Sequence, residues 1–372
     1  MALGPRDTQS LVMLTGWDAT ELQNFKLQDG TTYAAVVAQM NAALGALNAE
    51  IVSHPLWSSL VSYTDQPDHE YRIGSSNGFE DHTEYGEPDH KRAATEGHMF
   101  PLKAFDRGLG WTWDYLRKAR MSHLEADIAD AIKDARDKWR VQILTRLLKR
   151  GDDSGAANGL GSSGLSPGFA TAAASTGVDF TPPTYAGIAF DSDHEHYVGI
   201  AGGAFTAAVF SDSKDELREH GHDGPYEFMI GPSDETAVRA LSGFKEVGES
   251  WVNYGADTTL ASFGRDQVAP GVYPIGALND FRVWVVSGMP QYYGFAWQSY
   301  GANSQRNPVR IRLQKGETSP MFVAYIDNAV SGPPAPIKGL YLFTEFGVGI
   351  GDRTNGTARY VNNATWADGT PT

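Results

Sequence analysis

The chain contains no cysteine among its 372 residues, which excludes disulfides, thiolate nucleophiles, Cys-ligated zinc and iron–sulfur clusters. It also lacks any run of 18 apolar residues, so we expect no segment that spans a membrane. The first residues, Met-Ala-Leu-Gly-Pro-Arg-Asp, lack the basic and apolar regions of a signal peptide. Together these absences favour synthesis and residence in the cytoplasm.

Positive charge is scarce as well, because 30 Lys and Arg stand against 45 Asp and Glu, a formal net charge of −15. That balance argues against a protein that wraps nucleic acid through phosphate contacts. Common catalytic and cofactor motifs are missing, since there is no Gly-x-Ser-x-Gly elbow and no Walker loop. The glycines of Gly347–Asp352 lack the spacing of a dinucleotide loop. We therefore expect no catalytic residue, no cofactor and no metal.

What the chain does contain is globular in character, with 41% hydrophobic and 20% charged residues. Its length predicts about two or three domain-sized parts. Near the N-terminus a helix is predicted after Thr31 or Thr32, because apolar residues recur at helical spacing from Tyr33 to Leu47.

An acidic segment follows between Tyr63 and Asp106. It has few apolar residues, no helical period, and ten acidic against four basic residues, a net charge of −6. Two strands, at Glu70–Ile73 and Met99–Phe105, are predicted to form an extended hairpin arm around a long polar excursion. A loop of that length is uncommon inside a compact domain unless it has a function or is disordered.

The strongest helical pattern runs from Asp114 to Arg150 without Gly or Pro, and Gly151 supplies a stop. At 1.5 Å per residue such a helix is a rod of roughly 55 Å, which fits an elongated subunit better than a round enzyme. The segment carries ten basic and six acidic residues, a local charge of +4. We therefore expect a long helix with a basic surplus beside an acidic arm.

The second half alternates short strands and helices, which indicates an α+β region with a mainly antiparallel or mixed sheet. Asp152–Thr184, rich in Gly, Ser and Ala, is predicted to be a loop or hinge. Strands are predicted at Tyr197–Ile200, Tyr226–Ile230, Val283–Val286, Val309–Leu313, Phe322–Ile326 and Gly339–Phe346. Helices are predicted from Ser211 to His220 and from Ser233 to Leu241.

Two clusters in this half have a functional and a plainer interpretation. His194, His196, His220 and His222 are so spaced that they could bind zinc if the two pairs met in space, although solvated polar turns explain them more simply. The aromatic run Gln291–Tyr300 could stack on a sugar or base, but core packing or a subunit contact is the favoured interpretation.

The order of these elements resembles the major capsid proteins of tailed bacteriophages, which have the Hong Kong 97-type fold. No single motif is diagnostic, so the resemblance rests on order and length over nearly the whole chain. The segments that carry it are Tyr71–Gly74 and Lys103–Gly110 (the E-loop limbs), Leu217–Gly221 and Tyr226–Pro232 (the axial domain), Gly276–Ser287, and Phe346–Tyr360 (the closing strands).

The resemblance implies an α+β, Hong Kong 97-like fold divided into five parts. These are an N-terminal arm at 1–62, an extended β-hairpin E-loop at 63–106, a peripheral (P) domain at 107–185 with the spine helix 114–150, an axial (A) domain at 186–338 with some P-domain strands, and a return to the P domain with the C-terminal tail at 339–372. Because no long coiled-coil segment precedes the arm, the resemblance also implies a separate scaffolding protein, or a scaffold segment that this chain lacks.

In function, the resemblance implies a structural protein and no enzyme. Pentamers and hexamers would assemble into an icosahedral shell that encloses phage double-stranded DNA without specific binding. The implied partners are other copies, portal and scaffolding proteins and a possible decoration protein, with no membrane, and the implied location is the virion after synthesis in the bacterial cytoplasm. Some family members crosslink a lysine to an asparagine, for which Lys91 or Lys103 and Asn362 or Asn363 are imperfect matches.

Two alternatives remain open from the sequence. An encapsulin-like nanocompartment would use the same fold around a protein cargo. A metal-dependent enzyme would use the four histidines, His194, His196, His220 and His222. In the capsid interpretation, the acidic arm laid across a neighbour's basic helix would supply register and orientation more than affinity.

Overall fold

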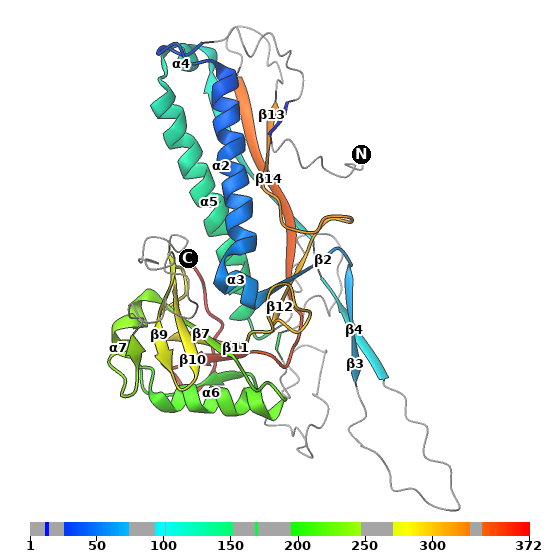
Figure 1. The fold of residues 1–372 in the computed structure, drawn as a ribbon, viewed down its shortest axis with the longest axis vertical. Coiled ribbons are helices and arrows are strands. Elements are labelled where there is room, and N and C mark those ends of the chain that lie inside the picture. The colour runs from blue at the N-terminus through cyan, green and yellow to red at the C-terminus, as the bar shows by residue number, and fades with distance from the viewer. Residues whose placement is uncertain are drawn as a thin grey trace, which may run out of the picture. The chain divides into compact units, whose positions relative to one another are not determined.

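The computed structural model describes residues 12–14, 26–73, 94–100, 102–151, 168–169, 195–246, 271–327 and 337–372 (Figure 1). The chain divides into two compact units. Unit 1 comprises Met1–Ser53, Leu102–Arg140 and Leu313–Gly347. Unit 2 comprises His54–Pro101, Val141–Arg312 and Val348–Thr372. Each unit is therefore assembled from three separate stretches of sequence.

Unit 1 contains a sheet built around β14 (Ile337–Ile350), whose last residues continue into unit 2. On one edge β14 pairs antiparallel with β13 (Val323–Asp327), and β1 (Val12–Leu14) pairs parallel with β13. On the other edge it pairs antiparallel with β5 (Lys103–Thr112) along the whole length of β5. The predicted strands at 322–326 and 339–346 are thereby confirmed, with the second longer than expected.

The predicted helix over 114–150 is two helices, α4 (Trp113–Lys118) and α5 (Met121–Leu147). Ala119 breaks the pattern because its backbone is extended, with φ −75° and ψ 147°. The backbone N–H of Met121 then donates to Asp29 Oδ2 at 2.7 Å, which caps the start of α5. The sequence contains no breaking residue there, so the turn depends on this tertiary contact.

Helix α2 (Tyr33–Ser53) lies beside α5 in unit 1 and confirms the helix predicted from Tyr33 onward. Its polar residues bind elements of the same unit: Arg136 makes a two-pronged ion pair with Glu50, and Asn48 bonds the backbone of Phe322 at 2.9 and 3.1 Å. By length and composition α2 would pass for a membrane span, with a mean hydropathy of 1.3 over 18 residues. Buried core helices meet the same criterion, and the face from Tyr33 to Ile51 is buried here.

Unit 2 contains a mixed seven-stranded sheet in the order β6-β15-β11-β7-β10-β9-β8. The strands are β6 (Tyr197–Gly199), β15 (Thr357–Tyr360), β11 (Tyr293–Gln298), β7 (Tyr226–Ile230), β10 (Phe281–Val286), β9 (Val272–Leu278) and β8 (Lys245–Glu246). Helix α6 (Ala207–Glu219) packs on it, with the Phe210 ring 4.3 Å from that of Phe228. The unit also holds η2 (Pro232–Asp234), α7 (Glu235–Arg239), α3 (Pro55–Leu60), β2 (Val61–Thr64) and β12 (Val309–Arg312).

Residues Tyr293–Gln298 of the aromatic run Gln291–Tyr300 form β11, and every residue of that strand is buried. Its favoured interpretation as core packing is therefore confirmed. Gly294 is needed at this place, because a Cβ there would lie 2.7 Å from the ring of Phe228 and 2.8 Å from that of Phe205.

The C-terminal tail after β15 is bound to unit 2 by several contacts. Gly369 N donates to Leu148 O, Asp368 Oδ1 accepts from Arg150 N at 3.0 Å, and the Tyr293 hydroxyl donates to Ala367 O at 2.8 Å. The Trp366 ring packs edge-on at 5.1 Å from Tyr197. The tail thus covers the carbonyl end of α5.

We predict that a chain ending at Thr365 loses about 2–4 kcal/mol of free energy of unfolding, since these bonds and the Trp366 contact disappear together. Urea unfolding followed by circular dichroism measures the loss. Thr370→Ala, at an exposed position, is the control and leaves the midpoint unchanged. Equal midpoints for the truncated and full chains would contradict a structural role for the tail.

Candidate functional site

A two-stranded ribbon projects from unit 2, formed by β3 (Asp68–Ile73) and β4 (Ala94–Met99) in antiparallel pairing (Figure 1). In the part of the chain that the structure describes, neither strand pairs with a further strand. The first predicted limb is confirmed. The second lies at 94–99 and not at Met99–Phe105, because Phe100 is buried and its N–H donates to Pro67 O, which closes the ribbon. Residues 74–93 of the predicted hairpin, including Lys91, lie outside the described residues.

The root of the ribbon is fixed on strand β12. Strand β2, which leads into the ribbon, pairs parallel with β12, and the Ser62 hydroxyl adds a bond to Val309 O. On the return side, Arg312 Nη1 donates to Phe100 O at 2.6 Å. The outgoing and returning chains are therefore both held by the same strand. Sequence reasoning missed Arg312, whose only signal is an arginine at the end of a short apolar strand.

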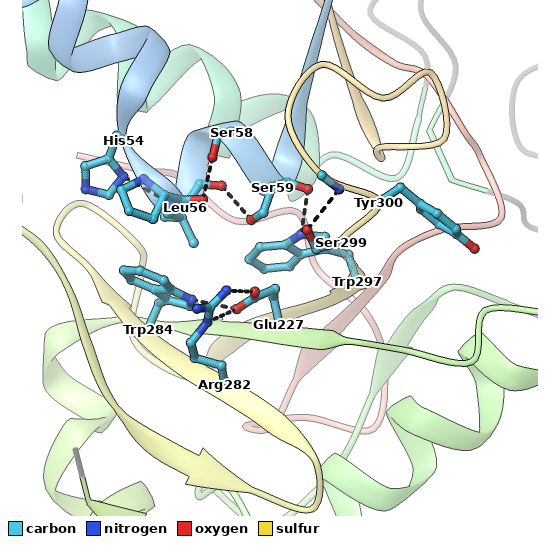
Figure 2. Close-up of polar contacts among 12 residues, drawn as sticks. His54, Leu56, Ser58, Ser59, Glu227, Arg282, Trp284, Trp297, Ser299 and Tyr300 are labelled. Carbon is cyan, nitrogen blue, oxygen red and sulfur yellow. Dashed lines mark hydrogen bonds and ion pairs between the residues drawn. The ribbon is translucent and has the colours of Figure 1, made fainter. Parts of the chain in front are cut away.

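Helix α3 links this root to the seven-stranded sheet (Figure 2). His54 begins the helix, and its Nδ1 accepts from Leu56 N at 3.2 Å. At the other end, Trp297 Nε1 on β11 donates to Ser59 O at 3.2 Å. The His54 bond fixes where the helix begins, and the Trp297 bond holds the helix on the sheet. Because β2 follows α3 directly, the position of the ribbon root depends on the position of this helix.

Beside this link the sheet buries a charged group, Glu227 on β7, which is 1% exposed (Figure 2). Its carboxylate accepts from both Nε and Nη2 of Arg282 and from Trp284 Nε1 at 2.7 Å. Hydrogen bonding to Glu227 raises the pKa of Arg282, so the guanidinium stays charged. In the sequence, the only sign that position 227 needs a buried cationic partner is that it is a lone glutamate within the apolar run 226–230.

The structure brings together two of the four candidate metal histidines. His196 Nδ1 lies 2.6 Å from Gly356 O and therefore donates to it, which leaves its Nε2 to bond His220 Nε2 at 2.8 Å. His222 lies elsewhere, against the Tyr300 hydroxyl and Thr354 Oγ1, and burial lowers its pKa. His194 falls outside the described residues. Within the described ranges no three His, Asp or Glu side chains are grouped so as to hold a metal ion.

Next to this pair a second buried ion pair joins α6 to β15. Glu216 Oε2 accepts from Arg359 Nη2 and from Thr357 Oγ1 at 3.0 Å, while Arg359 Nε donates to Ser213 Oγ at 2.9 Å. Burial raises the pKa of Glu216 to about 6, and the positive charge of Arg359 opposes that rise. The two histidines and the Glu216–Arg359 pair thus connect helix α6 to the seven-stranded sheet.

Part of the basic surplus of the predicted spine helix is balanced by carboxylates elsewhere in the chain. Arg136 pairs with Glu50, Arg140 with Asp137 at 2.6 Å, and Arg150 with Glu195 at 2.5 Å. Arg146 donates to two backbone carbonyls. Of these carboxylates, only Glu50 and Glu195 lie outside the segment 114–150, so they lower its net charge from +4 to +2 as the expected complement of an acidic arm.

The crosslinking candidates are divided between the two units. Lys103 begins β5 in unit 1, whereas Asn362 and Asn363 are exposed after β15 in unit 2. These residues stay imperfect matches for the crosslink, as the sequence indicated.

Comparison with known proteins rests on structure, since no family model and no curated protein sequence matches the chain. A solved structure from Mycobacterium phage Patience is similar over 100% of this chain and 97% of its own length, with 17% sequence identity and a TM-score of 0.61. The capsid of a native GTA particle matches 85% of this chain and 90% of its own at 14% identity and TM-score 0.47. The mature capsid of bacteriophage PhiM1 matches 82% and 87% at 12% identity and 0.46.

Only the first of these three likenesses has a TM-score above 0.5, and it covers both chains almost completely. At 17% identity it establishes the fold. The chain therefore has the fold of this phage structure, which confirms the α+β fold class that the order of elements predicted.

We predict that Glu227→Gln lowers the free energy of unfolding by about 2 kcal/mol, because an amide donor at the buried position 227 then faces the Arg282 guanidinium, which is 42% exposed and keeps part of its hydration. Urea unfolding followed by tryptophan fluorescence measures the loss. The control is Glu246→Gln, whose carboxylate is 66% exposed in its pair with Arg239 and costs less than about 1 kcal/mol. Similar losses for both variants would show that burial does not matter here.

For the second pair, we predict that Glu216→Gln costs about 3–5 kcal/mol, because it leaves Arg359, 4% exposed, without its counter-charge. The double variant Glu216→Gln/Arg359→Met recovers part of that loss. The pKa of Glu216 is about 6 in the folded chain against an ordinary value of 4.5, so the folded wild type binds this proton first as pH falls. Its stability advantage over Glu216→Gln therefore widens by about 1 kcal/mol between pH 6 and 4.5, and by about 2 kcal/mol over the whole titration. A gap independent of pH would contradict the raised pKa.

Proposed function

We propose that the chain is a phage shell protein that self-assembles as pentamers and hexamers into a closed icosahedral capsid around double-stranded DNA. The observation that carries the proposal is the likeness to the Mycobacterium phage structure along the whole of both chains. Its role is structural, not catalytic, and its location is the virion. We propose portal and scaffolding proteins, and a possible decoration protein, as further partners.

The ribbon supports assembly on physical grounds. A hairpin of six-residue strands is at best marginally stable in water, and it needs a third strand or another packed surface to become firm. Its root is nevertheless fixed in position by Arg312 and by the α3 contacts. An arm with a fixed root, and with no third strand paired to it in the described part of the chain, is suited to contact a neighbouring copy.

Closed shells constrain that contact further. Rings of five and six identical subunits are built from one heterologous contact repeated around an axis, so the same surfaces have to meet at two angles. A narrow arm attached at a single root can meet this requirement by a small change in direction. The five-part domain division predicted from the sequence belongs to the same proposal.

Negative-stain electron microscopy of the purified chain, with sedimentation velocity at two salt concentrations, tests assembly. Closed shells or rings support the proposal. A monodisperse monomer that never assembles, even with its native partners supplied, overturns it. Shells that contain protein cargo and no nucleic acid would select the nanocompartment alternative.

The ribbon root gives a sharper test. We predict that Arg312→Ala reduces the yield of shells at least tenfold, because the returning chain at Phe100 loses its anchor on β12. Lys315→Ala, an exposed cation three residues further on, is the matched control and assembles normally. Circular dichroism checks that both variants fold. Normal assembly of Arg312→Ala would show that the root does not position the arm.

A further inference from the structure

We propose that the turn between α4 and α5 carries a contact surface for the phosphate backbone of double-stranded DNA. This elbow patch consists of Lys26, Tyr115, Arg117, Lys118 and Arg120, all in unit 1. The proposal rests on the proposed function, because a shell around DNA places that polymer within reach of its subunits. The patch is locally basic although the chain as a whole has a net charge of −15.

The patch exists because the spine helix is broken. Extended backbone at Ala119 ends α4, so the cations on either side of the break are brought to one corner of the unit. The segment that begins at Lys26 is held against the same corner, where Gln28 N donates to Ala119 O at 3.1 Å and Asp29 caps Met121. Lys26 and the helical cations therefore share one surface.

The two arginines of the patch present their charge to a partner. The side chains of Arg117 and Arg120 are exposed, and within the described residues neither side chain makes a hydrogen bond or ion pair. The acid in the corner, Asp29, is engaged by the backbone N–H groups of Met121 and Thr31, and these bonds lower its pKa. Further along the spine the arginines at 136, 140 and 150 are all paired with carboxylates.

The surface has the chemistry of a backbone contact more than that of a protein interface. Stable protein interfaces have an apolar core with buried anchors. Among the large apolar side chains that the structure describes as exposed, only Tyr115, at 40%, belongs to the patch. Phosphate contacts need no such core, because Arg, Lys and Tyr side chains and counterion release supply the affinity.

Such a contact reads no sequence and is individually weak. About three or four neutralised phosphates give a slope near −3 for the logarithm of the binding constant against that of salt. In a shell the contact is repeated in every subunit, so the many weak contacts together give the shell a high avidity for DNA. This accords with DNA that is enclosed without specific recognition.

Fluorescence anisotropy of a short labelled DNA duplex, titrated with the unassembled full-length chain over a salt series, tests the proposal. We expect a salt slope near −3 for the wild type. Arg117→Glu/Arg120→Glu should bind at least tenfold more weakly with a slope closer to zero. Lys133→Glu removes an exposed cation of α5 outside the patch. Its binding constant for the duplex should stay within about twofold of that of the wild type, because the change in net charge alone has a small effect. Thermal unfolding checks that all three chains are folded.

Equal binding by the double variant and the wild type would overturn the proposal, as would equal losses in the double variant and Lys133→Glu. The rival occupant is the acidic segment 79–89 of a second copy, which has five acidic and no basic residues. It is the occupant if the double variant fails to form shells and Glu80→Arg/Asp81→Arg restores them, and this result also overturns the proposal. Failure of the wild type to assemble while it still binds the duplex in this way would count against the proposed function and leave the patch in place.

Discussion

A two-stranded ribbon in water is the constraint on which much of this structure depends. Strands β3 and β4 share one row of hydrogen bonds, and their outer edges have no partner strand in the part of the chain that is described. The chain responds by making the root firm, with β2 and Phe100 both held on β12. Helix α3 then carries that root onto the seven-stranded sheet through Trp297. A fixed base with a ribbon that pairs with no further strand among the described residues is suited to a subunit that is completed by its neighbours.

The sheet that supports the root is stiffened by buried polar groups as well as by apolar packing. Glu227 takes its donors from β10, and Glu216 on α6 takes its donors from β15. Each partner comes from a distant part of the sequence, so each bond fixes the register of one element against another. Such groups cost desolvation energy, and their benefit is that few other arrangements would satisfy them.

Charged side chains of the spine helix fall into two groups: some are paired within the chain, and others are exposed and can contact a partner. Most arginines of the spine helix neutralise carboxylates or cap carbonyls inside their own unit, as Arg136 and Arg146 do. The net charge of the segment therefore says little about what the surface presents. What remains exposed is concentrated where Ala119 interrupts the helix, beside Arg117 and Arg120. A local surface in an acidic protein can in this way be strongly basic.

The sequence by itself determined the fold class, the order of elements and those elements with a clear period, such as the helix from Tyr33. It failed on β11, because a strand buried on both faces has no alternation to detect. Only the tertiary structure decided that the spine breaks at Ala119, since Asp29 makes the competing contact from 92 positions away. It also decided that His196 meets His220 and not His222, because hydrogen-bond partners are selected by spatial proximity, which spacing along the chain does not encode.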